Sequence, residues 1–162
     1  MTKTESKGER AKAAALADPA MSTLERALAF AVAAHAGQRD KSGAPYVLHP
    51  LRLMLAMETD EERLAALLHD TVEDCEGVDF ATLAALGLPD TVLAALRLLT
   101  HDDDTPYEDY VRRINADPLA RRVKLADLRD NMNAARLTRF EAKDAERMTR
   151  YVKAHALLNG DG

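Results

Sequence analysis

The apolar residues of this chain recur mainly at spacings of three and four, which is typical of helices that bury one face. The clearest run follows Ser22, where Leu or Ala stands at positions 24, 27, 28, 31 and 34. Ser22 and Glu25 match a capping box, in which each side chain can accept a hydrogen bond from the other residue's backbone N–H. We therefore expect a helix that starts at Ser22 and ends near His35, before Gly37.

Other helices are expected where a start signal precedes apolar periodicity. Pro50 suits the first turn of a helix, and it directly follows His49. A second capping box opens a helix over about residues 59–74, and a last amphipathic helix is expected over about residues 142–158. Three aspartates are further cap candidates before apolar segments: Asp79, Asp90 and Asp117.

The fold class follows from what the pattern contains and what it lacks. No segment alternates apolar and polar residues with a period of two, so no strand is expected. Ala and Leu are abundant, whereas aromatic residues make up 4% of the chain, and this composition favours helices. Residues 37–46 contain Gly43 and Pro45 and are expected to form a loop. We predict an all-α fold, a compact orthogonal bundle of about seven or eight helices.

The domain organisation is expected to be simple. A chain of 162 residues is long enough for one domain with a sizeable core. Residues 1–20 are rich in polar and small side chains, so we expect a flexible N-terminal arm there. Residues 21–160 are then expected to form the single folded domain.

Charge and cysteine content limit the function classes. The net charge is -5 and no basic run is present, so nucleic acid is not an expected ligand, whereas a small anionic substrate is compatible with local cations. No apolar run approaches the roughly 20 residues that cross a bilayer, so no membrane partner is expected. The single cysteine, Cys75, excludes an internal disulfide and suits a reducing compartment, so we expect the cytoplasm. The sequence leaves a homo-oligomer open.

One face of the helix expected around residue 70 carries an imidazole and three carboxylates. At about 100° per residue, four side chains fall within an arc of about 140°: His69, Asp70, Glu73 and Asp74. Clustered carboxylates repel one another, and a divalent cation would remove that repulsion. Imidazole and carboxylate together form a suitable shell for a first-row metal ion. The alternative is a solvated acidic helix end.

Two residues elsewhere could complete such a site. His49 stands at an expected helix start, where its ring can point into the bundle. Asp127 lies within an apolar helical segment, with Asn131 one turn further on. Because a buried carboxylate needs a partner, Asp127 should meet either a metal ion or a buried Lys or Arg. The sequence does not place Arg129, Asp130 and Arg136, which could rim the same pocket.

Five segments occur in an order and spacing that are specific as a set. They are residues 35–38 (HAGQ), 41–46 (KSGAPY), 49–50 (HP), 65–74 (AALLHDTVED) and 124–132 (KLADLRDNM). Together they resemble the HD hydrolase domain of RelA/SpoT-homologue proteins, and in size the chain is similar to the stand-alone small alarmone hydrolases. The resemblance covers about residues 22–158.

The resemblance implies roles for nine residues. It implies one divalent metal ion, usually Mn²⁺, with Fe²⁺, Zn²⁺ and Ni²⁺ as alternatives for an ion bound in a crystal; the implied ligands are His49, His69, Asp70 and Asp127. An acidic pair helps to activate and position the attacking water, and it corresponds to Glu73 and Asp74. Residues near the nucleotide correspond to Lys41, Ser42 and Asn131.

The implied activity is removal of pyrophosphate from the 3′ position of a guanosine or adenosine alarmone. Asp40 stands where the family typically has an arginine that stacks on the guanine base, and Ala134 stands where it often has a threonine. Both departures concern recognition of the base, so hydrolysis of another nucleotide or of a phosphorylated cofactor is the alternative. A non-catalytic nucleotide sensor is the hypothesis from a different class.

His101, followed by three aspartates, is expected in a solvated turn.

Overall fold

The computed structural model describes residues 5–137 and 139–160, and within these ranges it is helical, which confirms the predicted all-α class. No strand is present there, and the single β-bridge joins Arg39 and Pro45. The described elements are α1 (Lys7–Ala15), α2 (Thr23–Ala34), α3 (Leu48–Leu55), α4 (Asp60–Leu68), α5 (Thr71–Asp74), α6 (Phe80–Ala84), α7 (Asp90–Leu99), α8 (Tyr107–Ile114), α9 (Pro118–Asn131), the 3-10 helix η1 (Ala134–Arg136) and α10 (Ala142–Asn159).

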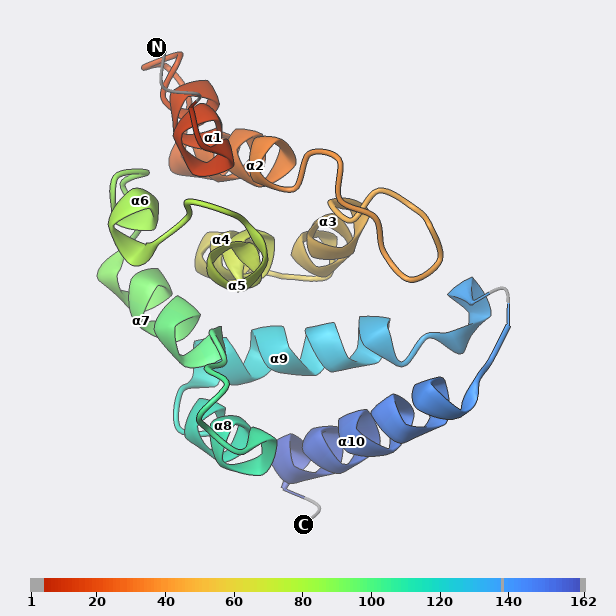
Figure 1. The fold of residues 1–162 in the computed structure, drawn as a ribbon. Helices are drawn as coiled ribbons and strands as arrows, with labels where there is room; N and C mark the ends of the chain where they lie inside the picture. The colour runs from red at the N-terminus through yellow and green to blue at the C-terminus, as the bar shows by residue number, and fades with distance from the viewer. Residues whose placement is uncertain (1–4, 138, 161–162) are drawn as a thin grey trace.

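Helix α4 lies at the centre of the bundle. It packs against α2, α3, α7 and α9, and in Figure 1 it is seen end-on, with α9 below it and seen from the side. Residues 64–68 of α4 are all buried, with Leu67 and Leu68 fully inaccessible. Burial on several sides fixes α4 as the support from which the next residues, His69 and Asp70, extend.

The helix expected over residues 59–74 is divided into α4 and α5. The capping box of Thr59 and Glu62 opens α4 as expected. The regular helix stops at Leu68, whose carbonyl oxygen accepts a hydrogen bond from the Thr71 hydroxyl at 2.8 Å. Asp70 has φ -98° and ψ -5°, which interrupts the helical repeat before α5 begins. The division is one reason why the described residues contain ten α-helices rather than seven or eight.

Residues 7–15, which lie within the arm expected over residues 1–20, form helix α1. Ser6 and Glu9 form a capping box, a start signal that the sequence reasoning did not use. Gly8, Ala11 and Ala15 are buried, and α1 packs against α2. Small side chains allow this close approach, so the segment gains buried area instead of staying in solvent. Residues 1–4 of the expected arm lie outside the described ranges.

The C-terminal part forms a second wall of the bundle. Helix α10 runs along α9 and contacts α8, and these three helices lie on the side opposite α1 and α2 (Figure 1). Its end at Gly160, which has a left-handed φ of 81°, agrees with the helix expected over residues 142–158. None of the described helices is both long and apolar enough to cross a membrane. The single-domain assignment of residues 21–160 stays a prediction.

Candidate metal centre

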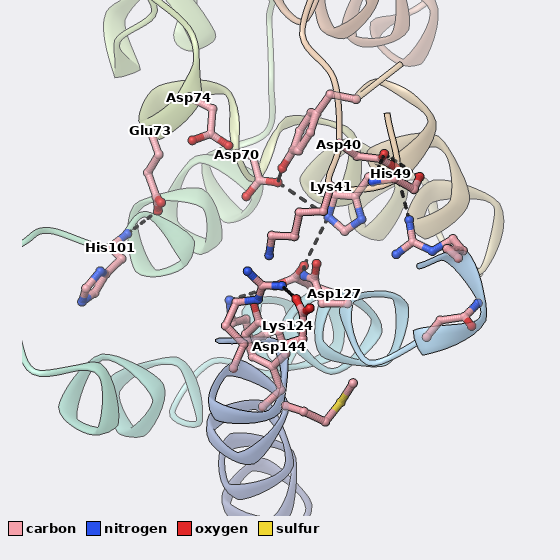
Figure 2. A pocket seen from close by; sticks show the side chains of 18 of the residues that line it. Asp40, Lys41, His49, Asp70, Glu73, Asp74, His101, Lys124, Asp127 and Asp144 are labelled. Atoms are coloured by element: carbon pink, nitrogen blue, oxygen red, sulfur yellow. Dashed lines mark hydrogen bonds and ion pairs between the residues drawn. The ribbon is translucent and has the colours of Figure 1, made fainter. Parts of the chain in front are cut away.

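A cavity of about 440 Å³ opens between α5, α9, α10 and the loop that joins α2 to α3. Eight of the nine residues with expected roles line it. The exception is His69, which is 3% exposed and lies beneath the cavity wall. Figure 2 shows side chains from several helices pointing into this space. The bundle therefore collects residues that are far apart in the sequence at one opening.

Both histidines use the Nδ1 atom to hold the ring in place. His49 Nδ1 lies 2.7 Å from Asp130 Oδ2, and His69 Nδ1 lies 2.9 Å from the carbonyl oxygen of Ala66. Each partner is an acceptor, so each Nδ1 carries a proton, and in the neutral ring, the form that binds a metal ion, each Nε2 presents the lone pair. The Nε2 atom of His69 is buried and has no hydrogen-bond partner in suitable geometry. An orphaned buried acceptor of this kind suits a metal ion.

Three of the four side chains expected to bind metal converge on one point, and the fourth, Asp127, lies next to them. Ligand atoms of His49, His69 and Asp70 all lie within 4.8 Å of one another. Asp70 Oδ2 is 2.9 Å from His69 Nε2, and Asp127 Oδ1 is 3.2 Å from His49 Nε2 and 3.8 Å from His69 Nε2. Two imidazole nitrogens and two carboxylates from α3, the α4–α5 junction and α9 thus surround one small volume. Figure 2 shows three of these side chains, His49, Asp70 and Asp127. This donor set fits a divalent first-row ion.

The electrostatics of this point favour a positive charge. Burial lowers the pKa of His69, but the carboxylates of Asp70 and Asp127 outweigh burial and raise that pKa well above its ordinary value. The same carboxylates would attract a metal ion placed between them and the ring. The residues present therefore fit a divalent cation in both geometry and charge.

Asp127 has two further partners within α9. Lys124 Nζ lies 2.8 Å from Asp127 Oδ2, and the Asn131 side-chain amide donates to Asp127 Oδ1 at 2.5 Å. Burial raises the pKa of Asp127, but Lys124 and the two histidines hold it well below its ordinary value, so the carboxylate stays ionised. The buried lysine that the sequence offered as an alternative to a metal is thus present. It occupies one carboxylate oxygen, while the other oxygen faces the histidines.

Glu73 and Asp74 lie beside this centre on α5, on the far side of Asp70 from His49 (Figure 2). Glu73 Oε1 accepts a hydrogen bond from the backbone N–H of His101 at 2.5 Å. Burial raises the pKa of both carboxyls, and the nearby Asp70 charge raises both further. Carboxyls with raised pKa values are suited to accept and release protons near neutral pH.

His101 does not lie in a solvated turn as expected. It lines the cavity, and its ring centroid is 4.7 Å from that of Tyr110. Its Nε2 pairs with the carbonyl oxygen of Thr105 at 2.7 Å, which closes the acidic loop on itself. Tertiary packing against α8 overrides the local turn signal, and the closed loop presents the N–H that holds Glu73.

The loop between α2 and α3 is organised by Asp40. Its Oδ1 accepts hydrogen bonds from the backbone N–H groups of Ser42 and Ala44, at 2.9 and 3.0 Å, and from the Ser42 hydroxyl at 2.6 Å. Its Oδ2 lies 3.4 Å from Arg136 Nη1. Both oxygens of the Asp40 carboxylate therefore already have partners, in the loop and in Arg136, and the arginine largely balances its negative charge before a substrate enters.

Lys41 follows Asp40 and points into the cavity (Figure 2). Burial and the nearby Arg147 lower its pKa. Ser42 and Asn131, the other residues expected near a nucleotide, also line the cavity, but their side chains already bond to Asp40 and Asp127. The structure thus places all three at the opening, and Lys41 is the one of the three that brings a positive charge to it.

Several cavity residues were missed by the sequence reasoning. Tyr46 donates a hydrogen bond to Asp70, and it stands three residues before His49, which is a usable signal. Lys124 could have been found from its i,i+3 spacing to Asp127. Arg147 and Tyr151 reach the cavity from α10. No local pattern indicates them, because α10 meets the site only through tertiary packing.

Comparison with known proteins points to one group. No protein-family model matches the chain. The guanosine-3′,5′-bis(diphosphate) 3′-pyrophosphohydrolase of Vibrio cholerae is 43% identical over 65 residues, which are 38% of this chain and 9% of that protein. The GTP pyrophosphokinase of Streptomyces coelicolor is 34% identical over 134 residues, 75% of this chain and 16% of that protein. The chain therefore spans less than a fifth of these curated relatives.

A similar fold is found among solved structures. The structure of a metazoan orthologue of SpoT, described as hydrolysing ppGpp and playing a role in starvation responses, matches with a TM-score of 0.67. The match covers 87% of each chain at 24% sequence identity. At this identity the likeness establishes the shared helical fold, and the chemistry has to be argued from the site residues.

Proposed function

We propose that this protein is a metal-dependent phosphohydrolase. The chain is related in sequence to RelA/SpoT-type proteins and has their HD-domain fold. The proposed reaction removes pyrophosphate from the 3′ position of a guanosine or adenosine alarmone. The observation that carries this proposal is the meeting of two histidine Nε2 atoms with the carboxylates of Asp70 and Asp127, next to Glu73 and Asp74.

The proposed cofactor is one divalent ion, Mn²⁺. The residues that would hold it are His49, His69, Asp70 and Asp127. Such an ion supplies a Lewis acid that polarises a phosphate oxygen and makes water a stronger acid. The orphaned Nε2 of His69 and the ionised state of Asp127 support this assignment.

The acidic pair on α5 is proposed to handle the proton of the attacking water. Water adds to the phosphorus that is attached to the 3′ oxygen. The bond between this phosphorus and the 3′ oxygen breaks, which forms pyrophosphate and a 3′ hydroxyl. Glu73 or Asp74 takes the proton that water loses, and the departing 3′ oxygen gains one. The raised pKa values of both carboxyls suit this exchange.

Lys41 at the cavity mouth is proposed to pair with the negatively charged phosphates of the substrate. An ammonium group acts as a point charge toward phosphate. Lys41 lines the cavity together with Arg147, and burial and the charge of Arg147 lower the pKa of Lys41. A polyanionic nucleotide would relieve the repulsion between the two cations, which favours a small anionic substrate.

The test is pyrophosphate release from ppGpp and ppApp by the purified protein with Mn²⁺. The Asp70→Ala variant should lose this activity, because it lacks a proposed ligand. A protein that binds Mn²⁺ but cleaves neither alarmone would contradict the substrate assignment. Nucleotide binding that raises the melting temperature without turnover would instead support the sensor hypothesis.

A second substrate class is favoured by the loop geometry. Asp40 is committed to Ser42, Ala44 and Arg136, so this loop position offers no cation to stack on a guanine base. Another nucleotide or a phosphorylated cofactor is therefore the alternative substrate. A phosphate-release screen over a panel of metabolites distinguishes it from the alarmones.

A cytoplasmic location stays a prediction from the single cysteine.

A further inference from the structure

Asp130 joins a proposed metal ligand to two arginines. Its Oδ2 accepts the hydrogen bond from His49 Nδ1 at 2.7 Å, and its Oδ1 lies 2.7 Å from Arg52 Nε. A second Arg52 nitrogen lies 2.8 Å from Oδ2, and Arg136 Nη2 lies 3.2 Å from the same oxygen. The Asp130 side chain is 12% exposed, so these contacts are made largely out of water.

The contact with Asp130 determines what His49 can bind. Because Nδ1 donates to the carboxylate, the lone pair is on Nε2, which lies 3.2 Å from Asp127 and 3.6 Å from Asp70. A partner on the second ring nitrogen fixes both the tautomer and the ring orientation of a metal ligand. His69 obtains this from the backbone of its own helix, whereas His49 depends on a side chain from α9.

The same network reaches the loop that carries Lys41 and Ser42. Arg136 in η1 donates to the backbone oxygen of Asp130 at 2.6 Å and pairs with Asp40 at 3.4 Å. Asp40 in turn holds the backbone of Ser42. A continuous chain of charged contacts therefore connects the proposed metal ligand to the loop at the cavity mouth.

We propose that Asp130 is a positioning residue that fixes His49 as an Nε2 ligand, and that Arg136 couples it to the loop over residues 39–45. This proposal rests on the metal centre of the proposed function. The competing explanation is that the network only stabilises the packing of α3 on α9.

The first test compares Mn²⁺ binding, measured by calorimetry, in wild type, Asp130→Asn and Glu62→Gln. Glu62 pairs with Arg122 at 3.0 Å away from the cavity, so its variant is a matched loss of a partly buried carboxylate. We expect about 10- to 100-fold weaker Mn²⁺ binding for Asp130→Asn and unchanged binding for Glu62→Gln. Binding within about twofold of wild type in Asp130→Asn, with helicity retained, would overturn the proposal.

A second measurement needs no variant. In wild-type protein loaded with Zn²⁺, histidine ¹H–¹⁵N spectra should show His49 protonated at Nδ1 and coordinated through Nε2. Coordination through Nδ1, or loss of its proton, would overturn the role of Asp130 even if Asp130→Asn failed to fold. Neither measurement uses a substrate, so a wrong substrate does not affect them. Wild type that binds no divalent ion would overturn both this proposal and the proposed function.

The role of Arg136 is tested on the loop itself. We expect Arg136→Gln to speed tryptic cleavage after Lys41 by about fivefold or more, because the loop would open more often. Mn²⁺ binding should stay within about threefold of wild type, because Asp130 keeps its contact with His49. An unchanged cleavage rate would show that Arg136 does not hold the loop and would overturn the proposed coupling.

Discussion

The Oε1 atom of Glu73 accepts a hydrogen bond from the backbone N–H of His101, with 2.5 Å between the two atoms. The contact spans 28 residues and joins α5 to the loop between α7 and α8. A backbone donor is a rigid anchor, so the Glu73 carboxylate is held at the cavity wall beside Asp70. Burial nevertheless raises its pKa, which leaves it able to accept a proton.

Glu73→Gln is expected to lower kcat by about 10²- to 10⁴-fold, because an amide can keep the His101 contact but cannot take a proton. Binding of Mn²⁺, measured by calorimetry, should be unchanged. Asp102→Asn in the neighbouring acidic loop is the control and should retain wild-type kcat. A Glu73→Gln variant with wild-type kcat would assign the proton transfer to Asp74.

Mn²⁺ is expected to stabilise the fold through the four converging side chains. At a concentration of 100 times Kd, binding contributes about 2.7 kcal/mol, which corresponds to a rise of about 5–10 °C in melting temperature. His69→Ala should abolish this rise, because the buried Nε2 is lost. His155→Ala, which changes a histidine on α10 outside the cavity, should keep it. An equal rise in both variants would place the ion elsewhere.

Asp40→Arg is expected to impair the protein, although it introduces the residue type that the family typically has there. The change removes the acceptor of three loop hydrogen bonds and sets a second cation beside Arg136. We expect kcat/KM for ppGpp to fall at least about tenfold, and stability to fall by about 1–3 kcal/mol. Asp104→Arg, the same charge change at an exposed position, is the control. A lower KM in Asp40→Arg would show that Asp40 opposes substrate binding.

Local patterns were sufficient for most of the helices, whereas the proposed site residues also needed the shared motif series. The capping boxes at Ser22 and Thr59 mark helix starts that the structure confirms. His69 and Asp70 were recognisable because they stand together at the end of a buried helix. His49 and Asp127 were recognised from the shared motif series, since no spacing within one helix could relate them to that pair.

Contacts between distant side chains could not be predicted from local patterns. Asp130 and Arg52 are separated by 78 positions, and Asp40 and Arg136 by 96. Their pairing depends on how α3, α9 and the 39–45 loop pack. The interruption at Asp70 was missed for a related reason: helical periodicity continues through residues 69–70, while the Asp70 side chain lines the cavity and accepts a hydrogen bond from the distant Tyr46.

The ion pair of Glu62 should make stability depend on pH. Burial raises the pKa of Glu62, but the backbone N–H groups of Glu58 and Thr59 and the charge of Arg122 outweigh burial and lower it. The unfolded chain, with a pKa of about 4.3, then binds more protons than the folded chain. The stabilisation is complete above that value and is lost as pH falls through the lower folded pKa.

Glu62→Gln is therefore expected to melt about 2–4 °C below wild type at pH 7, a loss of up to about 1 kcal/mol. At a pH below the folded pKa the two proteins should melt at nearly the same temperature, because the protonated acid resembles the amide. Thermal melts followed by circular dichroism across this range measure the difference. A gap that stays constant with pH would mean that packing, not charge, distinguishes the variant.

The packing of α1 is tested by Gly8→Ala, because two effects predict opposite signs for the change in the free energy of unfolding. Alanine favours a helix over glycine by up to about 1 kcal/mol, so in a solvated arm this change would be neutral or stabilising. In the structure a Cβ at Gly8 would lie 2.1 Å from the backbone oxygen of Gly77, so α1 would have to move away. We expect a loss of about 1–3 kcal/mol and faster amide exchange in α1. A raised melting temperature would show that α1 does not pack against residue 77 in solution.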